Sequence, residues 1–341
     1  MTIDRVDIRK SEVIQLLKQI NVPILNNNLV SLGMVRNLRI IDDYVYLRLY
    51  LGSCELDLKE EVRTKLSQLG WCKKTYIEIR TISQVRRTIG ISSGKGGVGK
   101  STIAVNLAAA LSLTGAKVGL LDADVYGPNI PQMMGLGHSE IIVTDTADGQ
   151  RFIPLEAHGI KLMSVGLLAE PDHPLAWRGP VLHKIINQFI HQVEWGELDY
   201  LLIDLPPGTG DAQITIVQES PICGVILVTT PQQVAIADVR RSVYMFRQVG
   251  VPVLGIVENM SYLLNENVDS FQAPQYIFGK DGGKLLSEEL EAPLLGQIPI
   301  HQRICESGDR GLPIILGDRH FLPSRILEQI AQGLTKTFNN L

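Results

Sequence analysis

The sequence of 341 residues has little cysteine and no excess of positive charge. Its four cysteines, Cys54, Cys72, Cys223 and Cys305, form no C-x-x-C pair, so nothing supports a disulfide scaffold or a local zinc knuckle. The 32 Lys and Arg residues are outnumbered by 36 Asp and Glu residues, which gives a net charge of −4. A nucleic-acid binder that works through bulk positive charge is therefore not expected.

Long hydrophobic runs are also missing. No apolar stretch approaches the roughly 18 residues of a membrane span, and the charged first ten residues contain no apolar core of a secretory signal. We therefore expect no membrane partner and a cytoplasmic location, where free thiols stay reduced. A hydrophobic fraction of 45% with 20% charged residues is ordinary for a globular protein and excludes disorder as the main state.

The length predicts about two domains, since domains average roughly 150 residues. Residues 1–82 follow the order helix, strand, strand, helix, strand, which is typical of a small α+β unit. The polar residues 83–87 are predicted to form a linker, and residues 88–341 a second domain. In the small unit, helices are expected at 11–20 and 58–69, and strands at 29–35, 44–51 and 76–82.

The second domain is predicted to be an α/β fold with a mostly parallel sheet. Six short runs are almost continuously apolar, as expected for strands that are buried on both faces. Helical patterns separate them, and the clearest apolar helical stripe covers residues 181–193. The six expected strands are 89–92, 118–121, 200–203, 225–228, 253–257 and 294–298.

A phosphate-binding loop is predicted between the first of these strands and the following helix. Residues 94–101 read GKGGVGKS and match G-x-x-x-x-G-K-[ST] in the structural context that the motif needs. The glycines let backbone N–H groups converge on phosphate oxygens, and the helix N-terminus adds partial positive charge. We predict that Lys100 reaches the β- and γ-phosphates and that Ser101 holds Mg²⁺. The predicted nucleotide-binding residues here are Gly94, Lys95, Gly96, Gly97, Val98, Gly99, Lys100, Ser101 and Thr102.

Carboxylates follow two of the expected strands. Asp122 and Asp124 close strand 118–121, and Asp204 closes the apolar run 201–203. Ligands of open α/β sheets bind at these strand ends, where carboxylates can hold Mg²⁺ or orient an attacking water. Asp122 and Asp204 are therefore predicted, with Ser101, as magnesium ligands. The alternative is that these carboxylates only cap a turn or the next helix.

Several motifs in a fixed order resemble one family. GKGGVGKST, LLDADVYGPNIP, WRGP, IDLPPGTGD, VTTPQ and ENMSY together resemble the Mrp/ApbC-type P-loop ATPases, relatives of MinD and ParA, over residues 88–320. Residues 32–35, LGMV, resemble a small domain shared with iron–sulfur assembly factors. The resemblance implies a homodimer that hydrolyses ATP and carries iron–sulfur clusters or helps to load them onto client proteins.

The resemblance also implies roles for single residues. Lys95 matches the signature lysine that crosses a dimer interface to the nucleotide of the partner. Lys95, Lys100 and Asp124 are the expected catalytic residues, and Asp124 would orient the attacking water. Asp204 matches the Walker B acid, and Asn259 matches the position that contacts adenine. The expected cofactors are ATP and Mg²⁺.

One family feature is missing. Family members place a C-x-x-C shortly after ENMSY, and two subunits share one cluster through it, but residues 263–276 read LLNENVDSFQAPQY. Cys54 resembles a lone cysteine of some N-terminal domains and is the candidate iron–sulfur ligand, although one thiolate cannot complete a four-ligand cluster. The alternative function is a nucleotide-switched dimer of the MinD/ParA type that positions a protein partner without a cluster. A metabolic kinase is a weaker third possibility.

Overall fold

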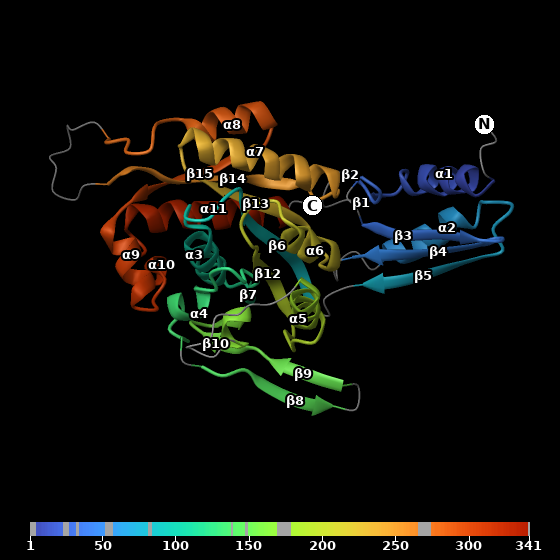
Figure 1. Cartoon of the computed structure of the whole chain (residues 1–341), viewed down its shortest axis with the longest axis horizontal. Helices are drawn as coiled ribbons and strands as arrows, with labels where there is room; N and C mark the ends of the chain where they lie inside the picture. Colours follow the sequence, from blue (N-terminus) through green and yellow to red (C-terminus); the bar gives the residue numbers. More distant parts are fainter. Residues whose placement is uncertain are drawn as a thin grey trace.

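The computed structural model of the chain has a small N-terminal unit beside a larger α/β unit (Figure 1). It describes residues 5–22, 27–31, 34–51, 57–80, 84–137, 139–146, 149–168, 179–264 and 274–339. The candidate ligand Cys54 lies outside the described residues, as does Arg178 in the WRGP motif.

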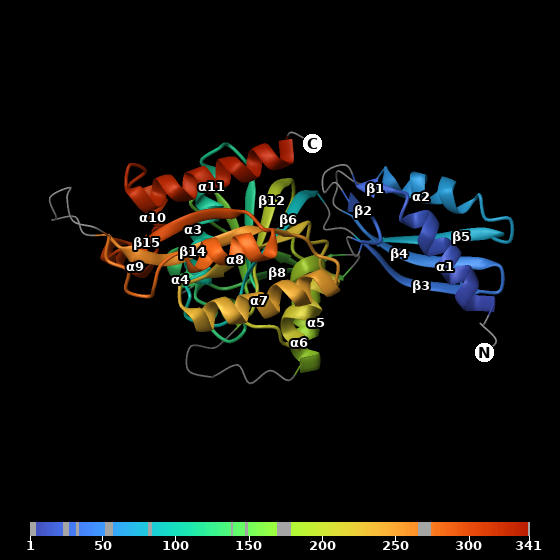
Figure 2. The ribbon, with the colours of Figure 1, turned by 90° about the horizontal axis from the view of Figure 1, so that it is seen from above.

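The small unit packs two helices on a three-stranded sheet (Figure 2). Strand β4 pairs antiparallel with β3 and parallel with β5, and a short ribbon, β1–β2, joins the unit. Alternating side chains of β4, Val45, Leu47 and Leu49, are buried under the helices. The two predicted helices and the predicted strands 44–51 and 76–82 are present as α1, α2, β4 and β5, although the first helix begins at Arg5 rather than at residue 11. The predicted strand 29–35 is wrong, because residues 29–31 form a turn and the strand that precedes β4 begins at Val35. Polar residues such as Arg36 and Arg39 hid this strand from the apolar pattern. The elements are α1 Arg5–Leu17, β1 Asn21–Val22, β2 Asn27–Asn28, β3 Val35–Ile41, β4 Tyr44–Tyr50, α2 Leu58–Leu66 and β5 Lys74–Arg80.

The larger unit is built on an eight-stranded sheet in the order β10-β11-β7-β12-β6-β13-β14-β15. All neighbours are parallel except β10, which pairs antiparallel with β11. The six predicted strands are all present, and the predicted α/β fold with a mostly parallel sheet is confirmed. The strands are β6 Val85–Ser93, β7 Val118–Asp122, β10 Leu155–Ala157, β11 Ile160–Ser164, β12 Leu198–Asp204, β13 Gly224–Thr229, β14 Val253–Leu263 and β15 Leu294–Ile300.

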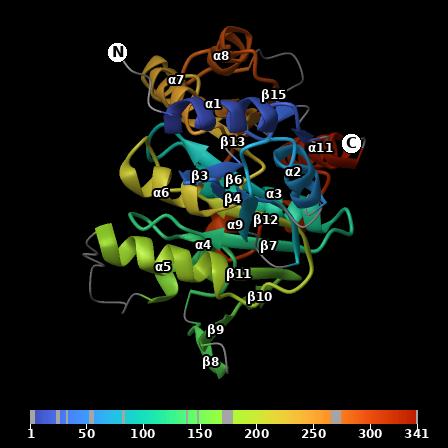
Figure 3. The same ribbon diagram turned by 90° about the vertical axis from the view of Figure 1, so that its right-hand side faces the viewer.

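Helices cover both faces of this sheet (Figure 3). Successive residues of one strand belong to opposite cores. Leu202 lies in the core that includes α3, α10 and α11, whereas Leu201 and Ile203 lie in the core that includes α5, α6, α7 and α8. Because both faces are buried, the central parts of these strands are almost continuously apolar. The helices are α3 Lys100–Ser112, α4 Ile130–Met133, α5 Gly179–His191, α6 Asp211–Glu219, α7 Gln233–Gln248, α8 Gly282–Leu290, α9 Gln302–Asp309, α10 Ile314–Gly317 and α11 Leu322–Asn339.

The first strand of the sheet reaches into the predicted linker. Val85 and Arg87 pair with Leu198 and Tyr200 of β12, so residues 85–87 of the predicted linker 83–87 belong to β6. The charged side chains of Arg86 and Arg87 made this segment look like a linker, but its backbone is paired with β12. A hairpin of β8 (Ile142–Thr146) and β9 (Gly149–Ile153) projects beyond the β10–β11 edge of the sheet (Figure 3). No helix in the described part of the chain has both the length and the apolar character to cross a membrane.

Candidate nucleotide-binding site

The predicted phosphate loop lies between the end of β6 at Ser93 and the start of α3 at Lys100. Strand β12 is hydrogen-bonded to both β6 and β7, so Asp204 lies in register with Asp122 on one side and Ile91 on the other. All these groups therefore meet at the carboxyl edge of the sheet, which is where such folds bind ligands.

At two positions of the loop, only glycine fits. Gly99 has φ +82°, a conformation that L side chains rarely adopt, and a Cβ there would collide with Nδ2 of Asn259. A Cβ at Gly94 would collide with the backbone of Asp238 in the second turn of α7. Only glycine therefore lets the loop backbone pass this close to Asn259 and α7, and Gly96, Gly97 and Gly99 line the phosphate cavity.

Lys100 lies between two carboxylates at the foot of the loop. Its Nζ is 2.8 Å from Oδ1 of Asp204 and 3.1 Å from Oδ2 of Asp124, and its side chain is 6% exposed. Burial lowers the pKa of Lys100, but the two carboxylates outweigh it and raise the pKa overall. Lys100 is therefore a buried cation that is held at the position the motif predicts.

Ser101 and Asp204 form an oxygen pair beside this lysine. The Ser101 Oγ donates to Oδ2 of Asp204 at 2.6 Å. Burial raises the pKa of Asp204, whereas Lys100 and Ser101 oppose that shift. A hydroxyl and a carboxylate are the hard oxygen donors that Mg²⁺ prefers, so these two residues fit a magnesium ion.

Asp122 faces a different set of groups. Its Oδ2 accepts from Ser164 Oγ at 2.8 Å and Ile130 N at 3.4 Å, and its Oδ1 accepts from Asp124 N at 3.2 Å. Burial, and then the charge of Asp204, raise the pKa of Asp122 to about 8. These bonds tie the chain after β7 to its neighbours, whereas Ser101 is bonded to Asp204. The predicted metal role of Asp122 stays a prediction.

Lys95 is the half-buried lysine of the loop and lines the phosphate cavity. Its Nζ donates to Oε1 of Gln232 at 3.4 Å, and its carbonyl accepts from Ser93 Oγ at 2.9 Å. Gln232 was not predicted, because nothing in the sequence links the loop to a residue 137 positions further along. The sequence motif VTTPQ, which ends at this glutamine, is the signal that could have identified it.

Asn259 contacts the opposite side of the loop. Its Nδ2 donates to the carbonyl of Val98 at 2.8 Å, and the residue is 7% exposed. It also lines a cavity of about 420 Å³ that shares Gly99 and Thr102 with the roughly 330 Å³ phosphate cavity. The predicted nucleotide-binding residue Asn259 is therefore placed next to the loop that it was expected to join.

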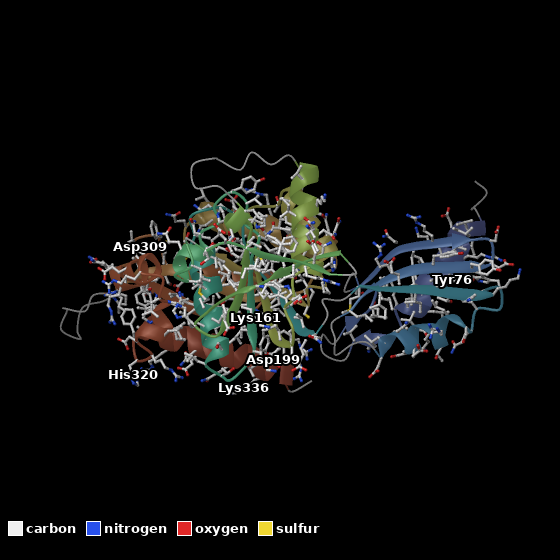
Figure 4. All side chains as sticks on the ribbon, turned by 90° about the horizontal axis from the view of Figure 1, so that it is seen from below. Tyr76, Lys161, Asp199, Asp309, His320 and Lys336 are labelled. Carbon is white, nitrogen blue, oxygen red and sulfur yellow. The ribbon has the colours of Figure 1, made fainter. Side chains whose placement is uncertain are left out.

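The larger cavity contains residues that sequence reasoning missed. Its outer wall comes from helix α9, whose last residue, Asp309, lies at the end of the larger unit away from the small unit (Figure 4). Seven histidines without metal spacing gave no reason to select His301. Apolar and polar groups around one cavity suit a nucleoside. The wall includes Met133, Met260, Pro299, His301, Ile304, Cys305 and Asp309.

A parallel α/β sheet with this loop and these strand-end carboxylates defines a P-loop NTPase. Residues 84–335 match the family model described as the NUBPL iron-transfer P-loop NTPase, and residues 10–79 match that of an iron–sulfur cluster assembly protein. The chain belongs to this iron-transfer P-loop NTPase family, and the resemblance predicted from the motifs is confirmed.

Curated relatives match the chain over most of its length. An iron–sulfur cluster carrier protein of Synechocystis sp. is 44% identical over 339 residues, which cover 94% of this chain and 96% of the relative. A protein of the same name from Escherichia coli strain K12 is 39% identical over 326 residues, or 91% and 87% of the two chains.

Solved structures share the larger unit. A nucleotide-binding protein from Archaeoglobus fulgidus in complex with ADP has a TM-score of 0.59 and 36% identity, and covers 68% of this chain and 89% of its own. The cell-division ATPase MinD from Pyrococcus furiosus has a TM-score of 0.55 at 21% identity, over 73% of this chain and 98% of its own. The likeness to MinD shows the fold alone.

Proposed function

We propose that this protein is a Mg²⁺-dependent ATPase that carries iron–sulfur clusters, or helps to load them onto client proteins, in the cytoplasm. The observation that carries the proposal is the cluster of Lys100, Ser101 and Asp204 at the phosphate loop. It occurs in a chain that matches named cluster carriers along nearly its whole length.

The residues at the loop can share the work of ATP hydrolysis. Lys100 would exchange its two carboxylate partners for the β- and γ-phosphates, while Ser101 and Asp204 hold Mg²⁺. Asp124 would then be released to orient the attacking water. Asp122 would keep Asp124 in place, because its carboxylate accepts a hydrogen bond from the Asp124 backbone N–H. Adenine would occupy the larger cavity beside Asn259.

Hydrolysis is proposed to need two copies of the chain. Within the described part of the chain, the hydrogen-bond partner of the Lys95 Nζ is the amide oxygen of Gln232 at 3.4 Å, and no carboxylate neutralises its charge. Two large apolar side chains close to Lys95 or to the phosphate cavity are exposed. Tyr126 (76% exposed) lines that cavity, and Val234 (64% exposed) comes two residues after Gln232, the partner of Lys95. A second copy would cover them and receive Lys95 at its own nucleotide.

Residues 263–276 contain no cysteine where the family places its C-x-x-C, so the cluster must be held elsewhere. Among the described cysteines, Cys223 is buried and the Sγ of Cys72 lies 3.6 Å from Thr75 Oγ1, while Cys305 is exposed. The described part of the chain contains no group of three or more His, Cys, Asp or Glu side chains placed to hold a metal. We therefore expect a labile cluster that depends on Cys54.

Anaerobic reconstitution of the full chain with iron and sulfide tests this proposal. We expect an iron–sulfur absorption band in the wild type and in Cys305→Ser, the exposed-cysteine control, and its loss in Cys54→Ser. Equal iron in all three proteins would remove Cys54 as a ligand. If none of them binds iron while ATP is hydrolysed, the carrier function is wrong and the nucleotide-switched dimer of the MinD/ParA type replaces it.

A further inference from the structure

A buried carboxylate next to the nucleotide site has no role in the function proposed above. Glu258 of β14 is fully buried and directly precedes Asn259. It accepts hydrogen bonds from the Ser261 hydroxyl, the Gly283 backbone N–H and, at 2.8 Å, the Gln297 side-chain amide. These uncharged donors come from β14, α8 and β15, so one carboxylate joins three elements.

The start of α8 relies on this carboxylate. Its N-cap residue, Asp281, has φ +60° and makes no side-chain cap, so the first N–H groups of the helix need acceptors from elsewhere. The carboxylate of Glu258 accepts one of them, at Gly283, and places negative charge at the positive end of the helix.

Two glycines allow α8 to begin this close to its neighbours. A Cβ at Gly283 would lie 2.9 Å from Oε2 of Glu258, and a Cβ at Gly282 would lie 2.5 Å from the carbonyl oxygen of Pro231. Both distances are shorter than packed atoms tolerate. The first turn of α8 is therefore held between Glu258 on one side and Pro231 on the other.

Glu258 and Pro231 are each followed in the chain by a residue that is hydrogen-bonded to the phosphate loop. Asn259, next to Glu258, donates to the carbonyl of Val98, and Gln232, next to Pro231, accepts from Lys95. Met260, which follows Asn259 and lines the larger cavity, has φ +54°, an uncommon conformation for a residue with a side chain. The surroundings must hold such a turn in place.

We propose that Glu258 is a positioning residue for the nucleoside part of the site. By binding Ser261, Gln297 and the first turn of α8, it holds the Asn259–Met260 turn against the phosphate loop. This role rests on the proposed ATP binding, and Glu258 itself would contact neither phosphate nor metal. If the start of α8 is shifted, binding of the nucleoside should therefore weaken more than binding of the phosphates.

A matched pair of helical glycines tests this in the full chain. Gly283→Ala places a methyl group against Glu258, whereas Gly333→Ala in α11 meets no atom within 4 Å. We expect Gly283→Ala to weaken calorimetric ATP affinity about tenfold, the size of one charge-assisted hydrogen bond, and inorganic triphosphate affinity less than about twofold. Gly333→Ala should change neither affinity.

Glu258→Gln is the second variant and keeps the shape of the side chain while one acceptor oxygen becomes a donor. It should weaken ATP binding about threefold and spare triphosphate, which a general loss of folding would not do. Equal losses for ATP and triphosphate, or no loss for either, overturn the inference.

Amide hydrogen exchange separates this inference from the proposed function. In the nucleotide-free chain, we expect Gly283→Ala, but not Gly333→Ala, to speed exchange in residues 258–263, the segment that Glu258 is proposed to hold. A wild type that binds no ATP contradicts the proposed function, and the exchange comparison still decides the inference. Unchanged exchange in Gly283→Ala overturns it.

Discussion

The Nζ of Lys100 lies 2.8 Å from Oδ1 of Asp204, although 104 positions separate the two residues in the chain. The lysine that should bind phosphate thus neutralises the carboxylate that should bind magnesium. Both groups are buried, and each would be costly to leave alone. Arrival of Mg²⁺ with a nucleotide would give each of them a new partner of opposite charge.

Lys100→Ala should abolish ATP binding. At least two charge-assisted hydrogen bonds to phosphate are lost, each worth about 1.5 kcal/mol or more, so the affinity should fall at least ~100-fold. Isothermal titration calorimetry checks this, with Lys117→Ala as a control, since Lys117 pairs with Glu197 on the surface. An unchanged ATP affinity would contradict the phosphate-loop assignment.

Lys95→Ala should keep ATP binding and lose most turnover. The missing charge acts on the transition state from the other subunit, and cations delivered in this way are worth roughly 10³-fold or more in kcat. The measurement is kcat and KM across a range of protein concentrations. A wild-type specific activity that does not depend on protein concentration, with a monomeric ATP-bound mass, would exclude the dimer requirement.

Asp124→Asn should bind ATP but hydrolyse it slowly, and so accumulate an ATP-bound dimer. The amide cannot orient or accept a proton from the attacking water as a carboxylate can. Light scattering with and without ATP measures the mass, and phosphate release measures turnover. Normal turnover in this variant would remove Asp124 from the mechanism.

Asp122 should make the stability of the protein depend on pH. Its folded pKa of about 8 lies above the ordinary value of 3.8, so between these values the folded state holds a proton that the unfolded state has lost. Its contribution is therefore present at low pH and is lost as the pH rises toward 8, by up to about 1.4 kcal/mol per unit.

Urea unfolding of the wild type and Asp122→Asn between pH 5 and 8 measures this. Asparagine resembles the protonated acid, so the variant should lose less stability than the wild type as the pH rises. Parallel stability curves for the two proteins would show that Asp122 keeps one protonation state across this range.

Local patterns in the sequence were sufficient for the fold class and the phosphate loop. Each of the six predicted strands is a run of consecutive apolar residues, which predicts burial on both faces, and all six are present. The loop at 94–101 is defined by glycines and a lysine within eight positions, and its cradle shape follows from those residue types. Such signals survive because strand burial and loop conformation are set mainly by neighbouring residues.

Only the tertiary structure decided which distant groups meet at that loop. Sheet order brings Asp204 to Ser101 and Gln232 to Lys95, while Asp122 is bonded to Ser164 and the turn after β7. The roles of α9 and Glu258 likewise depend on packing between strands and helices far apart in the chain. No spacing rule in a sequence encodes such contacts, because the direction of a buried side chain is determined by the partners that folding brings to it.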